Sequence, residues 1–107
     1  MAQSQMNHCA GEDSSAADAE LNRVYKDLLN KNKDDENASK KLREAQRAWV
    51  AFRNAELEAL YPAQDKQTEY GSIYPMCYAI VLTKMTKERT AQLRGMLQDK
   101  DPCDTSN

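Results

Sequence analysis

The feature that most constrains the fold is a helical repeat of apolar side chains between Asp34 and Pro62. Apolar or small residues recur there at steps of three and four, and only Glu56 interrupts them. Such steps place side chains on one face of a helix, which Asp34 or Asp35 can cap and Pro62 ends. About 25 residues at 1.5 Å each give a rod about 37 Å long. Its predicted inward stripe is Ala38, Leu42, Ala45, Trp49, Phe52, Glu56 and Leu60.

Two further segments repeat this pattern. The first begins at Ser4, or at Ser14 or Ser15 if Gly11 interrupts it, and ends before a polar turn at residues 30–34. The other begins at Pro75, a residue suited to the first helical position, and ends near Gln98. Their apolar stripes are Met6, Ala10, Ala17, Leu21, Val24 and Leu28 in the first, and Tyr78, Leu82, Met85, Arg89, Leu93 and Met96 in the last.

These segments predict an all-α protein. We expect an elongated antiparallel bundle of three long helices, with one longer loop at residues 62–74 between the second and third. The 107 residues form one domain over residues 1–98, followed by a flexible tail at residues 99–107. Three glycines are few for a β sandwich, and no apolar run approaches the roughly 20 residues of a membrane span.

Charge and side-chain chemistry argue against several classes of function. Fifteen basic and 17 acidic residues give a net charge of −2, which is unsuited to binding nucleic acid. His8 is the single histidine, so no catalytic triad or histidine metal pair can be assembled, and we expect neither cofactor nor metal. Glu56 and Glu58 point about 200° apart on a helix and make no carboxylate pair. We therefore expect a protein that is not an enzyme.

Three cysteines, Cys9, Cys77 and Cys103, allow at most one intramolecular disulfide. Cys9 and Cys77 both lie near the start of helices that run in the same direction, so the bundle brings them to one end. Cys103 lies past the other end. We therefore predict a Cys9–Cys77 disulfide, which would place the protein outside the reducing cytoplasm. Because Met1 leads straight into polar sequence, the chain is either cytoplasmic or the mature part of an exported protein.

The motifs resemble one known family. Residues 5–10 (QMNHCA), 17–25 (ADAELNRVY) and 45–56 (AQRAWVAFRNAE) are similar to the opening and central motifs of the lysozyme inhibitor LprI-like family. Residues 71–76 (GSIYPM) and 86–93 (TKERTAQL) resemble its closing motifs, in the same order. The resemblance covers about residues 5–97. It implies a periplasmic or secreted bacterial domain whose signal peptide has been removed, and inhibition of lysozyme.

From this resemblance we expect a binding protein that inhibits lysozyme or a related glycan hydrolase by occluding its cleft. A structural or envelope protein-interaction module with another partner is the alternative. Tyr70, Ser72 and Tyr74 in the long loop are the predicted plug, although these tyrosines can also simply cover the end of the bundle. The first 20 residues hold four acidic side chains and no Lys or Arg. From these we select Glu12, Asp13 and Asp18 as the surface that steers a basic enzyme.

Two aromatic residues are predicted in the core. Trp49 and Phe52 are expected there because both lie on the stripe of the second helix.

Arginines on or beside the stripes need partners, since unpaired guanidinium donors are costly to bury. We predict a structural network, or alternatively an anion or partner site, formed by Arg47, Arg53, Arg89, Glu20, Asn22 and Glu44. Arg89 is expected to bind Glu44 or Asn22.

Overall fold

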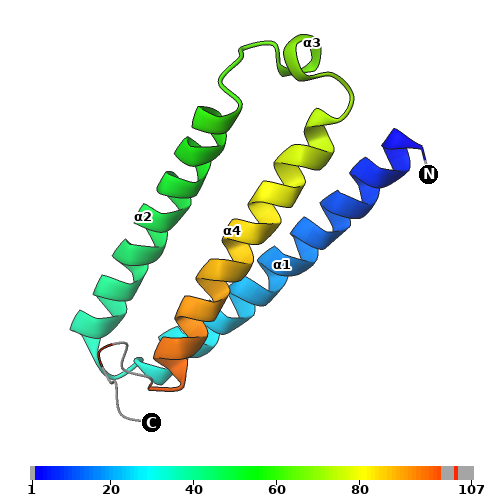
Figure 1. Cartoon of the computed structure of the whole chain (residues 1–107). Coiled ribbons are helices and arrows are strands. Elements are labelled where there is room, and N and C mark those ends of the chain that lie inside the picture. The colour runs from blue at the N-terminus through cyan, green and yellow to red at the C-terminus, as the bar shows by residue number, and fades with distance from the viewer. Residues whose placement is uncertain (1, 100–102, 104–107) are drawn as a thin grey trace.

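A computed structural model describes residues 2–99 and 103, and the regular structure within these residues is entirely helical. The three long helices are α1 (Gln3–Lys31), α2 (Glu36–Leu60) and α4 (Tyr74–Leu97). The expected all-α class is confirmed. The expected count of three helices omits α3 (Lys66–Tyr70), a short helix within the connection between α2 and α4 (Figure 1).

The helices form an elongated body that measures 49 × 28 × 28 Å. α1 and α4 run in the same direction, and α2, which lies between them in the sequence, runs in the opposite direction (Figure 1). The connection that carries α3 projects at one end of the long helices, where α1 also begins. No helix among the described residues is long and apolar enough to cross a membrane.

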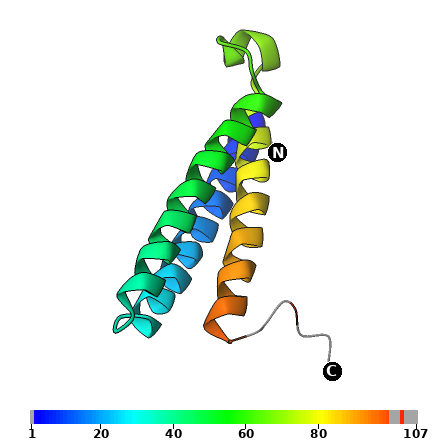
Figure 2. The same cartoon turned by 90° about the vertical axis from the view of Figure 1, so that its left-hand side faces the viewer.

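α1 and α4 are the most closely packed pair, and α2 lies mainly against α4 rather than α1. In the view of Figure 2, α2 passes in front of α1 and α4 lies to the right. The surface shared by α1 and α4 contains many small residues. These include the buried Ala10 and Ala17 on α1 and Ala79, Thr86 and Thr90 on α4. Small side chains allow two helices to approach closely. Because α1 packs in this way almost from its start, it continues through Gly11, and a start at Ser14 or Ser15 is wrong.

Polar contacts fix the ends of the helices. The Asp35 carboxylate accepts a hydrogen bond from the Ala38 amide at 2.9 Å, which confirms this residue as the cap of α2. At the end of α1 the Lys31 ammonium donates to the Leu97 carbonyl at 2.9 Å and to the Asp99 carboxylate at 2.5 Å. A cation at this place satisfies carbonyls that α4 leaves unpaired.

The main apolar cluster lies in the half of the bundle near the α1–α2 turn. It consists of Leu21, Val24, Leu28, Leu42 and Leu93, with the half-buried Trp49 packed against it. Phe52 is 56% exposed, so the prediction that it belongs to the core is wrong. α2 is rotated from its predicted stripe, so that Ser39, Gln46 and Leu57 are buried in place of Ala45 and Phe52.

The predicted Cys9–Cys77 disulfide is also wrong, because both cysteines are unbonded. The face of α1 near α4 carries Asn7 and Ala10, whereas Cys9 lies about 200° round the helix from Asn7 and is exposed. The cysteines therefore share one end of the bundle, as expected, but Cys9 points away from α4. Most of the predicted tail, residues 100–102 and 104–107, lies outside the described residues.

Candidate functional site

The connection between α2 and α4 is built around four tyrosines. The ring centroid of Tyr74 lies 5.3 Å from Tyr61, 5.6 Å from Tyr70 and 5.9 Å from Tyr78, and Tyr61 meets Tyr70 at 5.4 Å. Edge and stacked pairs at these separations are mutually attractive. All four side chains are half-buried, and burial raises the pKa of Tyr74 above its ordinary value. The tyrosines therefore form a small aromatic cluster that holds the connection in one shape.

Hydrogen bonds reinforce this cluster. The Tyr70 hydroxyl accepts from the Ala63 amide at 3.0 Å, and the Lys66 ammonium donates to the carbonyls of Tyr61 and Ala63 at 2.7 and 2.8 Å. Asp65 caps α3 by accepting from the Thr68 amide at 3.0 Å, and this bond lowers the pKa of its carboxyl. Tyr70 and Tyr74, predicted as contact residues, thus pack on their neighbours and support the loop.

Two exposed residues lead from Gly71, whose φ of 77° favours glycine, into α4. Ser72 is exposed, as is Ile73, a large apolar side chain that is 45% exposed. Ser72 was predicted as a contact residue, whereas Ile73 was not. The available signal was its position between the Gly71–Ser72 turn and Tyr74, where an isoleucine has little room to be buried. Ser72 and Ile73 form what we call the loop tip.

The fold places the loop tip beside the acidic part of α1. The Asn7 amide group donates to the Ser72 carbonyl at 3.0 Å and so joins the two segments. Glu12, Asp13 and Asp18 follow on the same helix, about 8 to 17 Å further along its axis at 1.5 Å per residue. All three are exposed. Of the three, Glu12 contacts a basic group, the exposed His8 imidazole at 2.7 Å.

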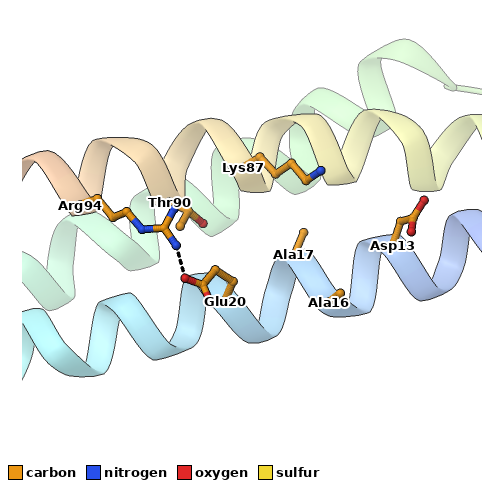
Figure 3. Close-up of a pocket in the computed structure, with 7 residues that line it drawn as sticks. All are labelled: Asp13, Ala16, Ala17, Glu20, Lys87, Thr90 and Arg94. Atoms are coloured by element: carbon orange, nitrogen blue, oxygen red, sulfur yellow. Dashed lines mark hydrogen bonds and ion pairs between the residues drawn. The ribbon is translucent and has the colours of Figure 1, made fainter.

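A groove of about 420 Å³ runs between α1 and α4 further along the bundle (Figure 3). Asp13 and Glu20 of α1 face Lys87 and Arg94 of α4 across it, and alanines and Thr90 form its floor. Glu20 forms ion pairs with Arg94 and, at 2.5 Å, with Arg23. The hydrogen bond from Arg23, with added attraction from Arg94, lowers the pKa of Glu20. The Glu20–Arg94 ion pair therefore connects α1 to α4 at this end of the groove.

The predicted arginine network is divided into separate local contacts. Arg89 donates to Gln46 and Gln92, both at 3.0 Å, and not to Glu44 or Asn22. Its side of α4 faces α2, away from Asn22, while Glu44 is exposed. Burial lowers the pKa of Arg89.

The other members of the network also have local neighbours. The Arg53 guanidinium lies 5.1 Å from the Trp49 ring centroid and donates to Asn54. Glu44 lies 3.9 Å from Lys41, Asn22 donates to Asp18, and Arg47 is exposed. A network that joins all six residues is therefore wrong, and Glu20 pairs with Arg94, which was not among the predicted members.

The described residues contain no group of three or more His, Cys, Asp or Glu side chains suited to a metal ion. A second hollow of about 280 Å³ lies where α1, α2 and α4 meet, with Arg53 and Asp18 in its lining. Neither of these two hollows has a nucleophile and a base in hydrogen-bond contact among its described lining residues.

Comparison with known proteins gives one family. A family model described as "Lysozyme inhibitor LprI" matches residues 1–93. An uncharacterized protein of Rhizobium meliloti (strain 1021) is 32% identical over 113 residues, a match that covers 94% of this chain and 78% of the relative. No solved structure matches the chain.

Proposed function

The chain belongs to the lysozyme inhibitor LprI family, and on this premise we propose that it binds lysozyme or a related glycan hydrolase outside the cytoplasm and occludes its cleft. The resemblance found in the sequence motifs is thereby confirmed. The proposal that this member inhibits such an enzyme draws its support from the family description and from the geometry of one end of the bundle. Location outside the cytoplasm, in the periplasm or secreted, belongs to the same proposal.

The observation that carries the proposal is the Asn7–Ser72 hydrogen bond, which holds the loop tip beside the acidic part of α1. A plug for a cleft needs a protruding apolar group on a rigid support, because a flexible loop loses entropy on binding. Ile73 is a large apolar side chain that is 45% exposed, and the tyrosine cluster supplies the support. Enzyme and inhibitor would associate without any bond being made or broken.

The acidic side chains of α1 supply the charge that attracts a basic enzyme to the proposed binding surface. Glu12, Asp13 and Asp18 are exposed and lie on the helix that holds the loop tip. Exposed charges of this kind raise the rate of encounter with a basic enzyme and contribute less to the lifetime of the complex. The proposed surface therefore combines a steering region on α1 with a contact region at the loop tip.

The test is inhibition of a c-type lysozyme in a turbidity assay, with two matched variants. Ile73→Asp should abolish inhibition because a charge replaces the apolar group that enters the cleft. Met96→Asp, a change at a side chain that is 52% exposed at the opposite end of α4, should leave inhibition intact. Equal inhibition by both variants would remove the loop tip from the contact. Absence of binding by the unmodified protein at about 50 µM would reject a c-type lysozyme as target.

An envelope protein-interaction module is the second candidate. The exposed acidic residues of α1 are the feature that favours it, since exposed charges of one sign can attract many basic partners. The same assay distinguishes the two candidates, because this module would leave lysozyme fully active.

A further inference from the structure

α2 is apolar over a wider arc than the bundle covers. Its buried residues are Ser39, Leu42, Gln46 and Leu57, and its contact with α1 is slight. A second set of apolar side chains lies on the opposite flank at steps of three, four, three and four residues. These are exposed and define the outer face of α2: Ala45, Ala48, Phe52, Ala55 and Ala59.

This spacing is that of a helix-pairing seam, because steps of three and four keep side chains along one line. Phe52, 56% exposed, lies at its centre. Alanines on either side would let another helix approach closely. An exposed aromatic side chain within an apolar helix face is a mark of a protein contact surface.

Charges on α2 indicate what covers this face. Residues 36–48 carry four basic and two acidic side chains, whereas residues 49–60 carry one basic and two acidic ones. A second α2 laid antiparallel therefore brings the positive half of each copy against the negative half of the other. A parallel arrangement would place like halves together.

We propose that the chain self-associates through the outer face of α2, paired antiparallel about a two-fold axis between Ala48 and Phe52. Each Ala48 then packs against Phe52 of the second copy, and each Ala45 against Ala55 of that copy. Lys41 lies four residues before Ala45, on the same line of side chains. In the dimer it lies opposite Ala59 of the second copy and next to Glu58 of that copy. Such an interface is isologous and closes at two chains.

The size of the face sets the expected strength. In this register residues 40–60 overlap, so the paired strip is about 30 Å long and, at about 10 Å wide, covers on the order of 300 Å² of each copy, at the low end for weak, reversible complexes. The dimer should therefore form at high concentration and dissociate on dilution. The loop tip and the acidic residues lie on other elements and stay uncovered, so the inference is independent of the proposed function.

Sedimentation of the whole chain between about 5 and 500 µM, with reductant present to prevent disulfides through Cys9, tests this inference. The mass should rise from 12.2 kDa toward twice that value. Phe52→Glu should remain monomeric throughout, whereas Ile80→Glu, at a side chain that is 54% exposed on α4, should still dimerise. Circular dichroism should show both variants folded. A constant 12.2 kDa mass, or equal behaviour of the two variants, would overturn the proposal.

A charge exchange tests the antiparallel register. Lys41→Glu and Glu58→Lys should each weaken dimerisation at least several-fold, because each places like charges opposite one another. Glu58 also lies 3.3 Å from Lys66 of its own chain, so circular dichroism should show the Glu58→Lys chain folded. The chain that carries both changes should recover the dimer. If the double variant stays as weak as the single ones, Lys41 does not face Glu58 of the second copy and the antiparallel pairing is wrong.

Discussion

Trp49 and Phe52 lie almost one turn apart on α2 but have different surroundings. Trp49 packs against the main apolar cluster beneath the Arg53 guanidinium, whereas Phe52 is 56% exposed. We expect Trp49→Ala to lower the free energy of unfolding by about 2–3 kcal/mol, somewhat less than for a fully buried aromatic residue. Phe52→Ala should lower it by less than about 1 kcal/mol. Urea unfolding at low micromolar concentration, where the proposed dimer should be dissociated, measures both. Equal losses would contradict the orientation of α2.

Arg89 and Gln46 show how a cation is accommodated without a carboxylate. Gln46 is 8% exposed, and its side-chain oxygen accepts from Arg89 at 3.0 Å. Arg89→Met would leave that buried oxygen without its donor, at an expected cost of about 1–2 kcal/mol. In a Gln46→Leu background the same change should cost less, since no acceptor is then stranded. Strictly additive losses in this double-mutant cycle would show that the two side chains do not interact.

Glu20 gives the stability a dependence on pH. Because hydrogen bonding and attraction from Arg23 and Arg94 lower its pKa in the folded chain, the carboxylate contributes stability above its unfolded pKa near 4.5. That contribution is lost as the pH falls through the lower folded pKa. Urea midpoints measured from about pH 6 to pH 3 should therefore fall less steeply for Glu20→Gln than for the unmodified protein. Parallel profiles would argue against the Glu20 contacts.

At the scale of elements, the contact between α1 and α4 depends on small side chains. Ala17 is 6% exposed and faces α4, while the adjacent Ala16 is exposed. Ala17→Leu should push the helices apart and cost about 1–3 kcal/mol, as overpacking does in other cores. Ala16→Leu adds the same atoms and the same helix propensity but should change the urea midpoint little. A tolerated Ala17→Leu would mean that the two helices are less closely packed.

The limits of the long helices could be predicted from sequence, because local signals determine them. Asp35, Pro62 and Pro75 act through hydrogen bonds and steric clashes within a few residues. The rotation of α2 could not be predicted, since its apolar arc continues from Leu42 round to Phe52 and offers more than one possible inward face. The buried face of α4 was missed for a related reason: Thr86 and Thr90 are buried by close approach of α1, and polarity alone marks threonine as a surface residue.

The candidate site, too, could be predicted from the sequence only in part. The acidic residues and the long loop are evident in the sequence, but their proximity depends on α1 and α4 running in the same direction. Tyr70 was correctly placed in the connection, whereas Tyr74, predicted there, begins α4. The packing of the tyrosines on one another is a tertiary contact between residues up to 13 positions apart, Tyr61 and Tyr74. Spacing along the chain carries no information about which of them face outward.

At the scale of the whole molecule, the ends of the bundle differ in chemistry. One end carries the loop tip and the acidic half of α1, while the other is closed by Lys31 on the end of α4. α2 contributes to neither surface and presents its outer face sideways. A single chain of 107 residues thus separates a proposed target-binding end from a proposed self-association face.

The steering and contact regions of the proposed inhibitor should therefore affect different rate constants. Neutralising Glu12, Asp13 and Asp18 as amides should lower the association rate with a c-type lysozyme and flatten its dependence on salt, because long-range attraction is screened over about 10 Å at 0.1 M ionic strength. Ile73→Asp should chiefly raise the dissociation rate, since it removes a contact formed only in the complex. Surface plasmon resonance at low and physiological salt separates the two effects. If the acidic variant changed only dissociation, α1 would be part of the contact itself, and the loop tip would no longer be the sole candidate for the group that occupies the cleft.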